Sequence, residues 1–137
     1  AQGGGLGRAI ITQIRQAFPT LTIIAVGTNA AASSAMIKAG ASVCATGENA
    51  VIYNCRKCTG EDLIVGPIGI LLTNAMYGEV SAAMASAVCE CDAHKIVIPS
   101  NRCNVYVTGS TSMSIAAHIS EIVAQIKTRV QPDSPLT

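Results

Sequence analysis

The sequence predicts an α/β fold, a three-layer, doubly wound and mostly parallel sheet of the Rossmann-like type. Short apolar segments rich in β-branched residues alternate with amphipathic helical segments along the chain. The connections are short and the apolar segments lack a polar face, as in strands that helices cover on both sides. A glycine-rich stretch, Gly3-Gly4-Gly5-Leu6-Gly7, opens the chain just before the first helical segment.

The individual elements follow from hydrophobic periodicity and from capping residues. Apolar residues at helical spacing predict helices over residues 6–18 and 30–39, a helix through Val51 and Ile52 to about Lys57 after a turn at 46–49, helices over 68–76 and 81–89, and a last helix that Ser112 or Ser114 caps. Asn29 is a favourable cap for the second of these helices. Apolar runs predict strands over residues 21–26, 41–45, 62–65, 95–98 and 105–107. We expect one Rossmann-like domain over residues 1–130 and a frayed tail over residues 131–137.

The glycine-rich stretch lacks the strand that normally leads into such a loop. Only Ala1 and Gln2 come before Gly3, whereas a phosphate-binding loop usually joins a central strand to a helix. The sequence therefore leads us to expect that a short apolar first strand is missing from the chain.

Composition excludes several classes of partner. The 137 residues carry a net charge of +1 and only 12% are charged, so no basic stripe is present for a nucleic acid. No apolar run is long enough to span a membrane. The six cysteines, without a visible signal peptide, favour thiols in a reducing, cytoplasmic setting. A high apolar share with few charges favours a homo-oligomer.

Candidate ligand-binding residues come from the loop and from the ends of the predicted strands. Ligands of such sheets bind outside the carboxyl ends of the strands, and these ends are rich in glycines, hydroxyls and amides. Ordinary turns have the same composition, which is the alternative interpretation. The candidate cofactor-binding residues are Gly3, Gly4, Gly5, Gly7, Arg8, Thr28, Asn29, Gly47, Glu48, Gly66, Gly69, Asn101 and Arg102.

The glycine loop indicates a small phosphate-bearing ligand, because glycines let the backbone approach a pyrophosphate at a helix start. Its spacing fits neither the dinucleotide fingerprint nor the short-chain dehydrogenase loop completely. The position where a ribose-binding acid is expected holds Gly27-Thr28-Asn29, without a carboxylate. Thr28 with Arg8 is compatible with a 2′-phosphate, so NADP or another nucleotide is a possible cofactor. Glu48 is the one carboxylate at these strand ends. It could act as a base or bind a ribose hydroxyl, or it could simply be a negative charge that the helix dipole favours at a helix start.

Other motifs receive weaker interpretations. Tyr53 and Lys57 have the Tyr-x-x-x-Lys spacing of a proton-transfer pair. The pair comes too early in the chain for that role, so a half-buried tyrosine beside a solvated lysine is the preferred interpretation. Cys55-x-x-Cys58 and Cys89-x-Cys91 invite a metal or redox interpretation. Both pairs are expected near helix C-termini, opposite the phosphate site, and we assign no metal site. His118 is expected at the surface of the last helix.

Several strings resemble a known family. These are GGGLGRAI at 3–10, ATGENAV at 45–51, NCRK at 54–57, IVGPIGI at 64–70 and KIVIPSNRCN at 95–104. Together they resemble a family of small bacterial Rossmann-like proteins, domain of unknown function family 3842, over nearly the whole chain. The resemblance implies a Rossmann-like fold, a bacterial cytoplasmic setting and an apolar strand ahead of the loop, and it implies no activity.

Three functions follow from these observations. The first is a nucleotide- or dinucleotide-binding protein, of the NADP-type oxidoreductase kind if it is an enzyme at all. The second is a non-catalytic ligand-sensing or assembly subunit of the same fold. The third is a cysteine-based metal or redox protein. No catalytic residue can be assigned from the sequence.

Overall fold

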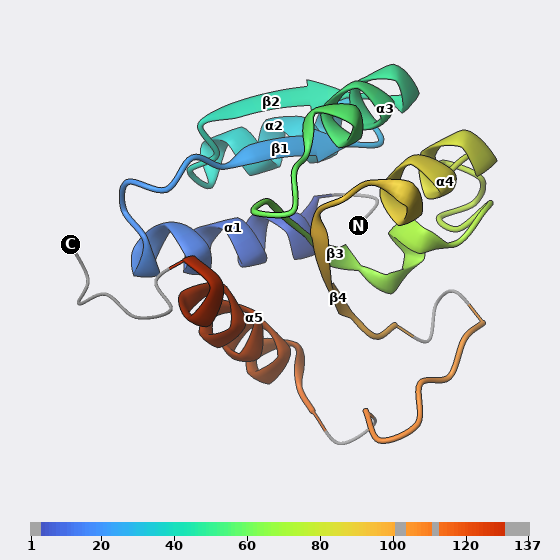
Figure 1. The fold of residues 1–137 in the computed structure, drawn as a ribbon. Coiled ribbons are helices and arrows are strands. Elements are labelled where there is room, and N and C mark those ends of the chain that lie inside the picture. Colours follow the sequence, from blue (N-terminus) through green and yellow to red (C-terminus); the bar gives the residue numbers. More distant parts are fainter. Residues whose placement is uncertain (1–3, 101–103, 111–112, 131–137) are drawn as a thin grey trace.

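The structure is a computed structural model that describes residues 4–100, 104–110 and 113–130. Helices and strands alternate along most of the chain (Figure 1). The helices are α1 (Gly5–Ala17), α2 (Ala30–Lys38), α3 (Glu48–Lys57), α4 (Ala82–Glu90) and α5 (Ile115–Val130), with a 3-10 turn η1 (Ile68–Leu71). The strands are β1 (Ile24–Gly27), β2 (Val43–Thr46), β3 (Leu63–Pro67) and β4 (His94–Ile98).

The four strands form two separate parallel pairs. β1 pairs with β2 from Ile24↔Val43 onward, and β3 pairs with β4 from Leu63↔His94 onward. The α/β class and the parallel pairing are therefore confirmed, whereas the described residues do not form one doubly wound sheet. Figure 1 shows β1 and β2 together above α1, and β3 with β4 beside them as a second pair.

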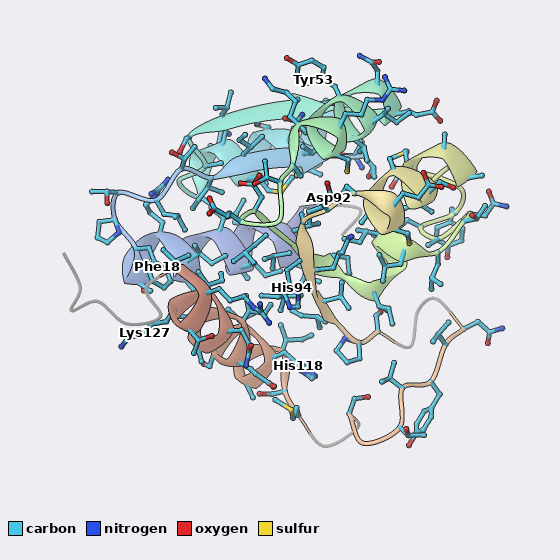
Figure 2. The ribbon with its side chains drawn as sticks, viewed as in Figure 1. Phe18, Tyr53, Asp92, His94, His118 and Lys127 are labelled. Atoms are coloured by element: carbon cyan, nitrogen blue, oxygen red, sulfur yellow. The ribbon has the colours of Figure 1, made fainter. Side chains whose placement is uncertain are left out.

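Helix α1 connects the two pairs through the core. Its buried residues Ile10 and Ile14 pack with Ile122 of α5 in a cluster that also takes in residues of β3, β4 and the segment before β1. Phe18 follows α1 and belongs to the same cluster, and Figure 2 shows it beside α5. The other side of α1 presents Ile11 to a second cluster with α2 and β1. An amphipathic helix with two apolar contacts thus positions both strand pairs.

A single arginine holds the segment between α1 and β1 in place. Arg15 donates to the carbonyl oxygens of Phe18, Pro19 and Leu21, and its Nε donates to that of Gly40 at 2.9 Å. These carbonyls lie in turns, where no hydrogen bond of a helix or strand uses them. The guanidinium therefore donates to oxygens that would otherwise bind water. The amino end of the β1–β2 pair is thereby tied to α1.

Two predicted elements are wrong. Residues 68–76 form only the short turn η1 followed by irregular turns, because Asn74, Met76 and Tyr77 adopt left-handed backbone angles that a helix excludes. Residues 105–107 form no strand, since a strand requires a paired neighbour and none of the described strands pairs with this segment. None of the helices described here is long and apolar enough to cross a membrane.

Candidate functional site

Four helices begin at the carboxyl ends of the strands or at the glycine loop. The residues before their first turns are Gly4 for α1, Asn29 for α2, Gly47 for α3 and Ser81 for α4. We call the surface around these starts the helix-start edge, and it consists of Gly4, Thr28, Asn29, Gly47, Glu48, Glu79 and Ser81. Helix starts present backbone N–H groups and partial positive charge, which attract anions and hydrogen-bond acceptors.

Specific contacts hold the starts of α2, α3 and α4 together. The amide of Gly47 donates to the carbonyl of Gly27 at 2.9 Å, which joins the ends of β1 and β2. The Glu79 carboxylate accepts from Thr28 Oγ1 at 3.2 Å and from Asn29 Nδ2 at 3.1 Å. Ser81 Oγ donates to Glu48 Oε2 at 2.5 Å. Residues from both strand pairs are thus collected into one polar site.

The glycines of the opening loop have different functions. Gly4 has a φ of +77°, and a Cβ there would lie 2.8 Å from Ala32 Cα. At Gly7 a Cβ would lie 2.7 Å from Met36 Sδ. These two glycines allow α1 to pack closely against α2, whereas a Cβ at Gly5 would meet nothing within 4 Å. Helix packing therefore explains part of the glycine pattern, and Gly5 is the open position of the loop. Arg8 lies exposed on the next part of α1.

The four helix starts fall into two kinds. Asn29 accepts from the amide of Ala32 and Ser81 accepts from that of Met84, so side chains cap α2 and α4. In contrast, α1 and α3 begin after the left-handed glycines Gly4 and Gly47, which provide no capping side chain. A ligand that carries acceptor oxygens can take the place of a cap at these two starts.

The structure brings five of the thirteen predicted site residues together. Gly4, Thr28, Asn29, Gly47 and Glu48 meet at the helix-start edge. Gly66 and Gly69 are buried at the carboxyl end of β3 and in η1. Gly3, Asn101 and Arg102 lie outside the described residues.

Glu79 is the residue of this site that the sequence analysis missed. It is half-buried, and it places a carboxylate on Thr28 and Asn29, the position where the sequence shows none. The segment between β3 and α4 carries it there, although 50 residues separate Glu79 from Asn29 in the chain. Its location before the Ser81 cap was the available signal, because a residue that precedes a helix after a parallel strand lies at this edge.

The cysteines of the two predicted pairs lie toward the opposite ends of α3 and α4. Cys58 and Cys91 are the residues that end α3 and α4, as the sequence predicts. Burial is the main cause that raises the pKa of the Cys55 thiol to about 11, and Cys91 and Cys58 add to the effect. Burial and then Cys91 also raise the pKa of Cys58. In the part of the chain that is described, no three His, Cys, Asp or Glu side chains are grouped to hold a metal ion.

Two other candidates lie away from the helix-start edge. Lys57 Nζ donates to Tyr53 Oη at 3.2 Å, but both side chains are exposed. Figure 2 shows Tyr53 at the top of the view, far from His118 on α5. His118 is half-buried and lines a cavity between β4 and α5, so it is less exposed than the sequence predicts. Neither the Tyr53–Lys57 pair nor His118 contributes to the site described above.

The fold and the site define a mixed α/β protein whose helix starts form one polar edge. The profile of one family, Domain of unknown function (DUF3842), matches residues 1–131, and the chain belongs to this family. The resemblance seen in the sequence is thereby confirmed. No curated protein and no solved structure matches the chain.

Proposed function

We propose that this protein binds a nucleotide or dinucleotide at the helix-start edge. One observation carries the proposal: α1 and α3 begin at glycines without capping side chains, beside a polar cluster of Thr28, Asn29 and Glu79. This arrangement offers phosphate-binding amides and hydroxyl-binding groups within one site, which is the combination that a nucleotide needs.

The phosphate group is expected at the start of α1. Gly5 leaves open space there, and α1 has no acidic residue in its first turn. The exposed guanidinium of Arg8 adds a positive charge one turn into the helix. An anion at this end gains from the helix dipole and from amides that no side chain of the described residues caps.

The ribose is expected at Glu79. A carboxylate accepts hydrogen bonds from the two hydroxyls of a free ribose, but it repels a 2′-phosphate. The hydroxyl and amide of Thr28 and Asn29 hold both oxygens of Glu79 in place. The site therefore favours a nucleotide with free ribose hydroxyls over NADP.

Binding without chemistry suits this site better than catalysis. Glu48 and Glu79 are the carboxylates of the helix-start edge. Among the described residues of this edge there is no histidine, lysine or cysteine that could complete an acid–base pair with either of them. We therefore favour a ligand-sensing or assembly role over the oxidoreductase role.

The proposal extends to the complete fold and to self-association. One further parallel strand between β1 and β3 would join the two pairs into the single sheet of a Rossmann-like domain. It would also cover strand residues that are only half-buried, such as Leu63 and Val65.

On the β1–β2 pair, Ile24 and Val43 are more than half exposed, and Tyr53 of α3 is similarly exposed. These apolar side chains provide a surface for a homo-oligomer.

Ligand binding can be measured by calorimetry and thermal shift with the full chain. The probes are AMP, NAD, NADP and inorganic phosphate. Gly5→Asp puts a negative charge at the start of α1, where it favours the helix but repels a phosphate. We expect binding of AMP or NAD to the unmodified protein and its loss in Gly5→Asp.

Gly60→Asp is the matched control. Gly60 is an exposed turn residue before β3, away from the helix-start edge, and a Cβ there would meet nothing within 4 Å. The same charge at Gly60 should leave ligand binding unchanged. If none of the four probes binds or raises the melting temperature, the phosphate-binding interpretation of the loop is wrong.

A further inference from the structure

Two cysteines occupy equivalent places at the ends of neighbouring helices. Cys58 ends α3 and Cys91 ends α4, both with extended backbone angles. Each thiol donates to a carbonyl of its own helix at 3.4 Å, Cys58 to Asn54 and Cys91 to Val88. The two sulfurs therefore project from the same kind of position on α3 and α4.

The paired strands that follow bring these two helix ends together. β3 and β4 start side by side at Leu63↔His94, and the amide of His94 donates to the carbonyl of Asp62 at 3.0 Å. Figure 2 shows Asp92 and His94 where the chain passes from α4 into β4, directly after Cys91. The chain before each strand is only a few residues long, so Cys58 and Cys91 lie near each other.

A third thiol completes the cluster. Cys91 interacts with both Cys55 and Cys58 and contributes to the raised pKa of each thiol. Cys55 is buried within α3, whereas Cys58 and Cys91 are both partly exposed. A reagent from solution can therefore reach Cys58 and Cys91 but not Cys55.

We propose that Cys58 and Cys91 form a reversible thiol–disulfide couple that exchanges with small-molecule disulfides. The Cys58 thiolate attacks one sulfur of the small disulfide, which forms a mixed disulfide and releases one small thiolate. The Cys91 thiolate then attacks the Cys58 sulfur, the protein disulfide forms and a second small thiolate leaves. The two protein thiols lose two protons and two electrons in total, and the small disulfide is reduced to two thiols.

The surroundings make this exchange slow at neutral pH. Thiolates are the attacking species, and burial, Cys91 and Asp62 raise the pKa of Cys58. Lys95 acts in the opposite direction and lowers it. Its ammonium group is held beside the cluster by the carbonyls of Cys89 and Cys91. The rate of exchange should therefore increase as the pH rises.

The chain sequence permits a direct test on the full-length protein. After incubation with oxidised glutathione and alkylation of the remaining thiols, trypsin and a glutamate-specific protease are used together. They cut after Lys57, Glu61, Glu90 and Lys95, which leaves Cys58 in the peptide 58–61 and Cys91 in the peptide 91–95. Each of these peptides contains one cysteine, so mass spectrometry of the digest identifies the bridge without ambiguity.

We expect the two peptides to be joined by a disulfide that reduced glutathione reverses. Cys89→Ser is the matched control, because Cys89 is an exposed cysteine next to the pair, and this variant should form the same bridge. Cys58→Ser and Cys91→Ser should each lose it while their circular dichroism stays unchanged. A bridge between Cys55 and Cys91 would overturn the proposal. So would free thiols at Cys58 and Cys91 under conditions that modify Cys89.

The couple does not depend on the proposed nucleotide site. The thiols of Cys58 and Cys91 lie at the C-terminal ends of α3 and α4, and the helix-start edge lies at the N-terminal ends of the same helices. A failure to bind nucleotides would leave the disulfide test unaffected, and the reverse also holds.

Discussion

Replacing Gly4 by alanine should destabilise the protein, whereas the same change at the adjacent Gly5 should not. The added Cβ at Gly4 would lie 2.8 Å from Ala32 Cα and 3.0 Å from Ala35 Cβ. Atoms of the α2 backbone cannot rotate away, and Gly4 also has a φ of +77°. The left-handed backbone and the overpacking together should lower the free energy of unfolding by about 3 kcal/mol.

Gly5→Ala provides the internal comparison. Gly5 is the first residue of α1, its Cβ would meet nothing within 4 Å, and its backbone is not left-handed. Alanine is the better helix former and restricts the unfolded chain, so we expect a gain of about 0.5 kcal/mol. Urea unfolding followed by circular dichroism, without ligand, measures both changes. If the two variants unfold at the same urea concentration, α1 does not pack on α2 as the structure shows.

Two further predictions concern Glu79 and Cys55. Glu79→Gln removes the negative charge with little change in shape, so the ratio of NADP to NAD affinity should rise about tenfold; an unchanged ratio in titration calorimetry would refute a ribose site at this residue. The pKa of Cys55 is raised from 9.0 to about 11 in the folded protein, so folding favours the protonated thiol. The resulting stabilisation of the folded state is present below pH 9 and is lost as the pH rises toward 11. The urea midpoint of Cys55→Ser should fall less over that range than that of the unmodified protein, and equal slopes would contradict the assignment.

Local signals in the sequence identified the helix starts and ends well. Asn29 was predicted to cap α2 and does so through the amide of Ala32. The first helix and the strand β4 lie within one residue of their expected limits. Caps, helical periodicity and β-branched runs act over a few residues, so they can be read from one chain.

Contacts between distant residues could not be predicted in the same way. In the region from η1 to α4 the backbone adopts left-handed angles at Asn74, Met76 and Tyr77. Gly78 indicates a break there, but methionine and tyrosine give no signal for such angles in a sequence. The position of Glu79 depends on this turn, so the carboxylate of the site was missed. The interaction of Cys91 with Cys55 and Cys58 similarly depends on the pairing of β3 with β4.

The two candidate sites are connected by the same pair of helices. At the starts of α3 and α4, Ser81 donates to Glu48, and at their ends Cys58 and Cys91 lie together. Helices packed along their length move as rigid bodies more readily than they bend. If a bridge at Cys58 changes the ligand affinity of the helix-start edge by some factor, bound ligand must change the disulfide equilibrium by the same factor. The affinity of the reduced and oxidised protein for one ligand would therefore measure both directions of this coupling.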